Sequence, residues 1–191
     1  MKKTLLAASI VAAFSAPAFA EGAFDGAYVG LSAGFLNNSA KVSASGSSTN
    51  FGKTGKFGGQ ILAGYSYGFD KTFNVATNVF YGLGSNNIDT TNQSSVNLKK
   101  VLGLSVEPGI YLADKTLAYV KLGVAKANLK SGSSSANTNG FLYGFGLKHM
   151  VTSNVYVGAE FQKIDFRSRS FANVSVNPDQ TYSGVTIGYK F

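Results

Sequence analysis

The 191-residue sequence has no cysteine, no tryptophan, three prolines and one histidine. The lack of cysteine excludes a disulfide framework and thiolate chemistry. One histidine among scattered carboxylates gives no metal-ligand spacing, so we expect no metal and no cofactor. Proline is rare and glycine is common, with 23 residues. Together with the many Ser, Asn, Phe and Tyr residues, this favours an all-β protein with polar connections.

The chain also lacks a predicted transmembrane helix at its N-terminus. The apolar run 5–14 (LLAASIVAAF) follows Lys2 and Lys3 and precedes the small-x-small sequence Ala18-Phe19-Ala20. That run is too short to span a bilayer, and the arrangement is typical of a secretory signal peptide. We predict that residues 1–20 are cleaved and that 21–191 form one domain, with a retained N-terminal anchor as the alternative.

Acidic residues are scarce: nine Asp and Glu stand against 17 Lys and Arg, for a formal net charge of +8. A basic balance is compatible with nucleic-acid binding, but an exported protein rarely meets nucleic acid. The charge therefore favours anionic lipid head groups as the partner, and we expect no nucleic-acid binding.

Apolar residues alternate with small or polar ones along most of the chain after the leader, and no helical period is evident. In the first segment Val29, Leu31 and Phe35 share one face, while Tyr28 and Ser32 share the other. The alternation recurs in eight segments, at 26–36, 56–67, 72–83, 98–112, 117–129, 140–150, 155–166 and 182–191.

The connections between these segments alternate in length. Long connections rich in Ser, Asn, Gly and Thr fall at 37–55, 85–97, 130–139 and 167–181, and tight ones at 68–71, 113–116 and 151–154. This asymmetry is typical of outer-membrane barrels, whose short turns lie in the periplasm. The sequence predicts an eight-stranded antiparallel up-and-down transmembrane β-barrel with long polar loops outside.

The two faces of the segments decide between a membrane barrel and a soluble one, whose apolar face would lie inside. The polar face carries mainly Gly, Ser and Ala with few charges, which suits a narrow barrel interior. Aromatic residues near the segment ends resemble two interfacial girdles. They are Phe35, Phe57, Tyr81 and Phe141 by the long connections, and Tyr67, Phe73, Tyr111 and Phe191 by the turns or terminus.

Three stretches resemble a known family. The sequence GVTIGYKF ends at Phe191, with Ile187 and Tyr189 at alternating positions before it. It resembles the C-terminal signal that the barrel assembly machinery reads. FDGAYVGLSAG (24–34) and YVKLGVA (119–125) resemble strands of the small barrels related to the OmpA transmembrane domain, OmpX and the opacity proteins. The resemblance implies a porin-family surface protein in the outer membrane of a Gram-negative-type bacterium.

Glu107 and Lys121 lie on the inward face of neighbouring segments, at equal sequence distance from Asp114 in the turn between them. Because inward residues must pair with inward ones, we predict an ion pair inside the barrel. Lys148 and Glu160 are near-diagonal on the next hairpin and would extend it. The group is either an ion or proton gate or a polar plug that neutralises buried charge, and a narrow interior favours the plug.

A second group of charges occupies the outward phase near the long connections. Lys100, Lys126 and Lys163 have this position, and Arg167 and Arg169 follow them. Cations are tolerated near the membrane interface, so we expect contacts with lipopolysaccharide phosphates. Ordinary snorkelling, or strands that end earlier, is the alternative.

The sequence favours a role other than catalysis. His149 is the one candidate for a Ser–His–acid hydrolase, but no clearly aligned serine and carboxylate flank it, so we expect no enzyme. The first hypothesis is an integral outer-membrane protein with a structural or surface-interaction role, binding surface ligands through its loops. A narrow passive pore for ions or very small solutes is the second, and a lipid-modifying hydrolase the third.

Overall fold

The computed structural model describes residues 22–44, 47–83, 85–88, 96–131, 134–171 and 174–191. Its strands are β1 (Gly26–Ala44), β2 (Ser47–Gly68), β3 (Phe73–Leu83), β4 (Ser85–Ile88), β5 (Val96–Ala113), β6 (Thr116–Ser131), β7 (Ser134–Met150), β8 (Val155–Phe166), β9 (Arg169–Phe171) and β10 (Val174–Lys190). Within these residues, no helix is long and apolar enough to cross a membrane. The predicted signal peptide, 1–20, lies outside the described residues.

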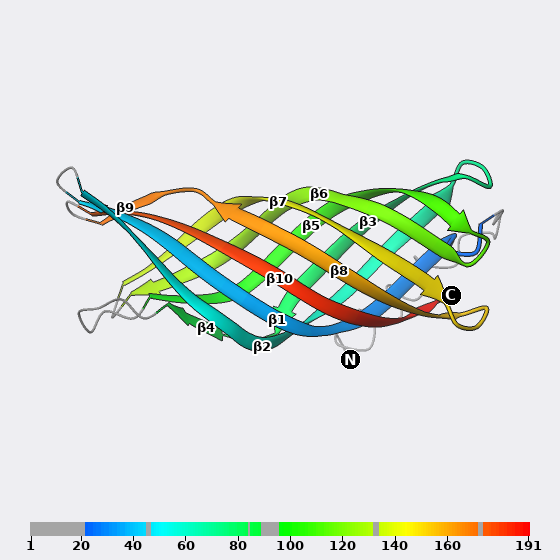
Figure 1. Cartoon of the computed structure of the whole chain (residues 1–191), viewed down its shortest axis with the longest axis horizontal. Coiled ribbons are helices and arrows are strands. Elements are labelled where there is room, and N and C mark those ends of the chain that lie inside the picture. Colours follow the sequence, from blue (N-terminus) through cyan, green and yellow to red (C-terminus); the bar gives the residue numbers. More distant parts are fainter. Residues whose placement is uncertain (1–21, 45–46, 84, 89–95, 132–133, 172–173) are drawn as a thin grey trace, which may run out of the picture.

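The strands form one closed antiparallel barrel (Figure 1). Each long strand pairs with its neighbours in sequence, and β1 pairs with β10 from Tyr28↔Lys190 to Ala44↔Val174, which closes the sheet. β4 extends β3 along β5, and β9 extends β8 along β10, so the strand segments make eight barrel strands. The predicted eight-stranded up-and-down topology is confirmed.

Three short turns gather at one end of the barrel, where residues 22–25 and the C-terminus also lie (Figure 1). We name this the turn end and the opposite one the extended end. In the first turn, the Asp70 carboxylate accepts hydrogen bonds from the amides of Thr72 and Phe73, at 2.6 and 2.7 Å. An aspartate that bonds to the next amides of the chain stabilises such a turn locally.

At the extended end the strands continue farther than the sequence predicts. β1 and β2 remain paired up to Ala44↔Ser47, so most of the predicted loop 37–55 is a hairpin. β6 and β7 likewise pair up to Ser131↔Ser134, inside the predicted loop 130–139. For these two connections the predicted loop boundaries were therefore wrong. Backbone pairing needs no apolar side chain. The strands therefore continue beyond the point at which the alternation of apolar residues in the sequence ends.

The apolar face of the strands points outward. Leu31 has an exposed fraction of 53%, while the adjacent Ser32 has 4%. Most of the aromatic residues assigned to the girdles are exposed on this wall, including the contacting pair Phe35–Phe57, and Phe191, which contacts Tyr189. Tyr111 is a correction: it shares the inward phase of Glu107 and packs at the mouth of the lumen. Tyr111 had been assigned to the outer face because it lies near a turn. The alternation along the strand correctly indicates that it faces inward.

Large side chains fill the interior. The sequence predicted an inward face of mainly small residues, but aromatic rings cover several of its glycines. Five buried aromatic residues lie directly across a strand pair from a glycine. The pairs are Tyr28↔Gly64, Phe80↔Gly103, Tyr119↔Gly146, Tyr156↔Gly188 and Phe166↔Gly140. A Cβ atom on each of these glycines would collide with the ring opposite. The glycines therefore make room for rings that lie across the narrow lumen.

Candidate functional site

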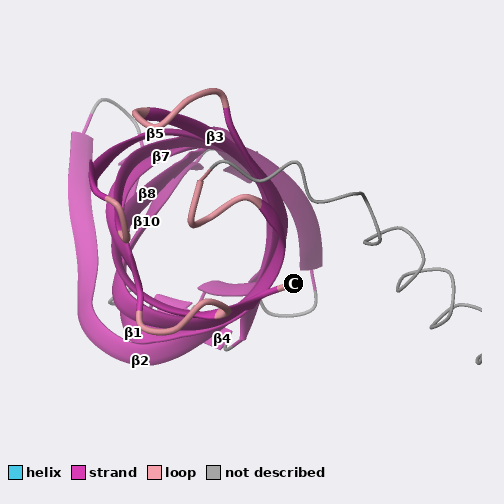
Figure 2. Cartoon of the chain, turned by 90° about the vertical axis from the view of Figure 1, so that its right-hand side faces the viewer, coloured by secondary structure: helices cyan, strands magenta, loops and turns pink. Residues whose placement is uncertain are grey.

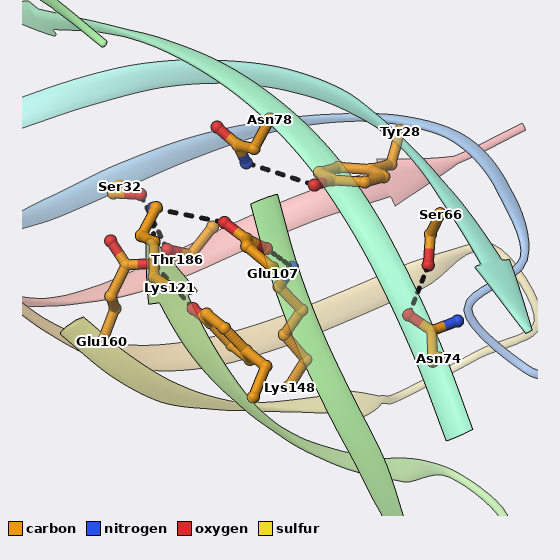
Figure 3. A network of polar contacts seen from close by, with 11 residues as sticks. Tyr28, Ser32, Ser66, Asn74, Asn78, Glu107, Lys121, Lys148, Glu160 and Thr186 are labelled. Atoms are coloured by element: carbon orange, nitrogen blue, oxygen red, sulfur yellow. Dashed lines mark hydrogen bonds and ion pairs between the residues drawn. The ribbon is translucent and has the colours of Figure 1, made fainter. Parts of the chain in front are cut away.

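A cluster of four charged side chains occupies the lumen (Figure 3). Glu107, Lys121, Lys148 and Glu160 each come from a different strand, β5 to β8 in order. Lys148 Nζ lies 2.7 Å from Glu107 Oε2, and Lys121 Nζ lies 3.3 Å from Glu107 Oε1 and 2.7 Å from Glu160 Oε2. We name this the lumen charge cluster. Its two cations and two carboxylates balance, so it carries no formal net charge.

Strand register explains how the cluster forms. The pairs Val106↔Leu122 and Gly109↔Tyr119 bracket Glu107 and Lys121, which places these two opposite each other as the sequence suggested. Lys148 pairs with Gly158, and Glu160 with Gly146, so these two are diagonal. Lys148 and Glu160 do extend the ion pair, but the contacts that extend it are not between these two residues. Each of them instead contacts the opposite charge of the β5–β6 pair.

Not all contacts in the cluster are equal. The 2.7 Å contacts are hydrogen-bonded ion pairs, whereas Lys121 and Glu107, at 3.3 Å, make an ionic contact without hydrogen-bond geometry. Glu107 and Lys121 are each 1% exposed. Burying a charge is tolerated only when its partners compensate for lost water. Each buried charge of the cluster is therefore tolerated because of its partners.

Aromatic rings surround the cluster, and sequence reasoning missed them. Lys148 Nζ lies 4.5 Å from the ring centroid of Tyr119 and 4.9 Å from that of Tyr28, and Lys121 Nζ lies 5.3 Å from that of Phe80. The Tyr119 hydroxyl also donates a 2.7 Å hydrogen bond to Glu160. The three distances from a lysine Nζ to a ring centroid are typical of cation–π interactions. Aromatic residues in the inward phase opposite glycines were the sequence signal that could have identified them.

The N-terminal segment, residues 22–25, closes the lumen at the turn end. Phe24 is 5% exposed, and its ring centroid lies 6.1 Å from that of Tyr111 and 6.3 Å from that of Tyr156. Its amide donates to the Tyr111 hydroxyl, and the Asn74 amide group donates to Asp25 at 3.1 Å. In Figure 2, which views this end, a short loop lies within the ring of strands. Tyr111 thus belongs to a lid over the mouth.

Several buried polar atoms of the lumen have no protein hydrogen-bond partner within the described residues. They are Asn78 Oδ1, Ser105 Oγ, Tyr156 Oη, Tyr182 Oη and both side-chain polar atoms of Gln162. Groups of this kind are normally satisfied by buried water. The lumen is therefore packed but polar along part of its length.

The outward cations fall into two groups. Lys163 is compensated, because its Nζ lies 3.3 Å from Asp165 and 3.8 Å from Asp179. Lys100, Lys126 and Arg167 are exposed. The side chain of Arg169 lies outside the described part of the structure. The structure thus separates cations that the sequence treated alike.

His149 is exposed on the outer wall near the turn end. Its Nδ1 lies 2.9 Å from Thr116 Oγ1 across the β6–β7 pair. A threonine hydroxyl in this position orients the ring but supplies no carboxylate of a catalytic triad. The described residues also contain no group of three His, Cys, Asp or Glu side chains that could hold a metal ion.

Comparison with protein families identifies the architecture. The family model described as "Outer membrane protein beta-barrel domain" matches residues 6–191. The chain belongs to this outer-membrane β-barrel family. A comparison with curated protein sequences gives no match.

The structure of Neisserial surface protein A supports the fold of this outer-membrane barrel. Neisserial surface protein A is 18% identical, with 86% of this chain and 97% of that one covered and a TM-score of 0.53. Ail, the attachment invasion locus protein of Yersinia pestis, is 17% identical over 86% and 98% of the two chains, with a TM-score of 0.47. The outer membrane protease OmpT of Escherichia coli is 9% identical over 86% and 96%, with a TM-score of 0.49. At such identities the likeness concerns the fold alone.

The C-terminal strand of the outer-membrane barrel holds the residues assigned to an assembly signal. Ile187 pairs with Leu31 and Tyr189 with Val29, and both side chains point outward. The Phe191 amide donates to the Ala27 carbonyl at 2.9 Å, and its ring lies 5.3 Å from that of Tyr189. The three apolar side chains thus share the lipid-facing wall at the turn end.

Proposed function

We propose that this outer-membrane barrel is a closed integral protein with a structural or surface-interaction role. The observation that carries the proposal is the lumen charge cluster. Ions that pass an eight-stranded barrel must displace side chains from its axis, because the interior is just wide enough to hold them. Here the axis is occupied by hydrogen-bonded ion pairs flanked by Phe80, Tyr28 and Tyr119.

The energetic argument supports a closed barrel. Separating a buried ion pair leaves a charge uncompensated, at a cost of about 3–5 kcal/mol. A rearrangement of that cost is populated only about one time in a hundred or less. The lid formed by Phe24 and Tyr111 adds a second obstruction at the turn end.

Conductance tests the proposal. We expect the mature chain, residues 21–191, to give no resolvable single-channel steps in planar lipid bilayers. Glu107→Ala should behave in the same way, since Lys121 still contacts Glu160 and the lid is intact. Lys115→Ala, an exposed residue of a turn, is the matched control. Stable steps from the unaltered chain would contradict a closed barrel.

A narrow passive pore is the second candidate function. The buried polar atoms without protein partners favour it, because they line part of the lumen with groups that bind water. On that hypothesis the lumen charge cluster is a gate, and Glu107→Ala raises the conductance reproducibly. The bilayer recordings therefore discriminate the two candidates.

The partners follow from the surfaces. Lipopolysaccharide would meet the outward cations Lys100, Lys126 and Arg167, while Lys163 is compensated by acids. The barrel assembly machinery would read Ile187, Tyr189 and Phe191. Surface ligands would meet the extended end, which presents paired strands beyond the lipid. A lipid hydrolase is disfavoured, because His149 faces Thr116. Export by a cleaved leader, 1–20, and periplasmic placement of the turn end complete the proposal.

A further inference from the structure

A groove of about 770 Å³ lies on the outer wall of the barrel, toward the extended end. Its apolar floor includes Leu102, Leu104, Val124 and Phe141. Its rim carries Lys126, Asn139 and Arg167, together with Asp165. The groove therefore combines an apolar surface with cations at one edge.

The cations mark the level at which the lipid-facing wall ends. Along β6 the outward side chains run Val120, Leu122 and Val124, and then change to Lys126. Along β7 they run Phe145, Tyr143 and Phe141, and then change to Asn139. A change from apolar to charged side chains at one height places the rim at the level of lipid head groups.

Strand pairing fixes the rim residues side by side. Lys126 pairs with Asn139, and the Asn139 carbonyl accepts a 2.9 Å hydrogen bond from the Arg167 amide. The Arg167 carbonyl in turn accepts a hydrogen bond from Thr138 Oγ1. The backbones of β6, of β7 and of the residue that follows β8 thus place two cations and one amide in a row. Their side chains are all exposed.

The charge at the rim remains positive after the acid is counted. Asp165 is engaged by Lys163 at 3.3 Å, so that pair balances. Lys126 and Arg167 have no carboxylate partner within the described residues. A third cation, Lys100, lies in a β-bulge between Lys99 and Leu102, and Leu102 pairs with Lys126.

The backbone of Lys100 has a φ of +54°, a region that non-glycine side chains rarely adopt. A bulge at a barrel rim re-aims the side chain that it carries. Glycine would hold this conformation without strain, so the bulge holds Lys100 in its exposed position at a cost in backbone strain.

We propose that this groove binds one phosphorylated acyl lipid of the lipopolysaccharide class. The acyl chains lie on the floor formed by Leu102, Leu104, Val124 and Phe141, and a head-group phosphate lies between Lys126 and Arg167. Arginine binds phosphate oxygens in a bidentate manner, lysine adds a compact charge and the Asn139 amide adds a neutral donor. The proposal rests on the lipid contact suggested above and assigns it to one site.

A second hollow on the same wall gives an internal comparison. It measures about 610 Å³, and its lining includes Leu31, Leu147, Val157 and Ile187. Its polar lining includes Thr116 and His149 where the first groove has Lys126 and Arg167. Lys148 also contributes to this lining, but its Nζ is paired with Glu107 inside the lumen at 2.7 Å. An apolar hollow thus occurs at both places, and the cations of the groove at the extended end are exposed, whereas the Lys148 ammonium of the second hollow is neutralised by Glu107.

Native mass spectrometry of the mature chain in neutral detergent tests the proposal, with hexa-acyl diphosphoryl lipid A as the probe. We expect K126Q/R167Q to lower the apparent affinity at least about tenfold, since both charge-assisted hydrogen-bond donors to the phosphate are lost. K71Q/K115Q removes the same two charges at the turn end and should leave the affinity unchanged. K126R/R167K keeps the charge and should retain most of the binding.

The outcomes separate the alternatives. An equal loss in both double variants would overturn the site in favour of nonspecific attraction, and no loss in either would overturn it outright. Competition by inorganic phosphate at matched concentration would show a free-phosphate site and overturn the lipid as occupant. Heat-shifted gel mobility confirms that each variant is folded. The closed-barrel proposal is tested separately: it fails if the unaltered chain conducts in planar bilayers.

Discussion

At the residue scale, Lys121 does most to hold the lumen together. It is the one member of the lumen charge cluster that contacts both carboxylates, Glu107 at 3.3 Å and Glu160 at 2.7 Å. The sequence predicted that Glu107 and Lys121 meet, because turn length and face alternation fix their register. It could not predict which partner Lys148 takes, since that depends on rotamers set by Tyr28 and Tyr119.

Lys121→Met tests the importance of this residue. Glu107 keeps Lys148 and Glu160 keeps the Tyr119 hydroxyl, but one buried negative charge has lost its cation. We expect a loss of about 3–5 kcal/mol in the free energy of unfolding, measured by urea titration of the chain refolded in liposomes. Lys115→Met at an exposed turn should change it by less than about 0.5 kcal/mol.

A second variant separates charge from packing. Lys121→Met combined with Glu160→Gln restores neutrality, and it should recover a large part of the lost stability. If the double variant were as unstable as Lys121→Met, or if Lys121→Met matched Lys115→Met, charge compensation would not be what the residue provides.

At the element scale, inward aromatic side chains lie over glycines of the neighbouring strand and favour one register. Gly64 lies opposite Tyr28, and a Cβ atom there would collide with the Thr77 carbonyl oxygen and sit 2.5 Å from the Tyr28 hydroxyl oxygen. The alternation that predicted the strands could not show this, because it assigns residues to faces and not to partners. Pairing across the barrel depends on a shear that the sequence pattern leaves open.

Gly64→Ala and Gly82→Ala form a matched pair that tests this packing. At Gly82 the nearest atom to a new Cβ is Val101 Cβ, at 3.4 Å, so alanine fits with slight adjustment. We expect Gly64→Ala to cost about 1–3 kcal/mol, as overpacking does, and Gly82→Ala to cost clearly less. Urea unfolding in liposomes measures both, and equal losses would contradict a specific fit of Gly64 against the Thr77 carbonyl and the Tyr28 side chain.

At the scale of the whole molecule, the fold was predictable and its extended end was not. In each of the eight segments, apolar outward residues alternate with small or polar inward ones. A bilayer requires this alternation of every strand that crosses it. Beyond the lipid, Ser- and Asn-rich sequence carries no such constraint, so strands that continue there looked like loops. The lid at the turn end was hidden for a similar reason. Phe24 belongs to no strand, and its place is set by contacts with Tyr111 and Tyr156.

The whole barrel has two obstructions along its axis, the lid and the lumen charge cluster. Because the chain has no cysteine, a single introduced thiol reports access to one point of the lumen. Ser66 is 3% exposed and lines a small void just inside Phe24, whereas Ser105 is 1% exposed and lies two residues beyond Glu107 on β5. The two positions therefore sample the two obstructions separately.

We expect Phe24→Ala to accelerate the reaction of Ser66→Cys with a methanethiosulfonate reagent by at least about tenfold, because removing a buried ring costs about 3–5 kcal/mol of packing. The same change should leave the reaction rate of Ser105→Cys unaltered, since Glu107 and Lys121 still block the path from the turn end. Rates are followed by intact mass in liposomes. Equal acceleration at both positions would mean that the lumen charge cluster is no barrier, and acceleration at neither would mean that Phe24 is no lid.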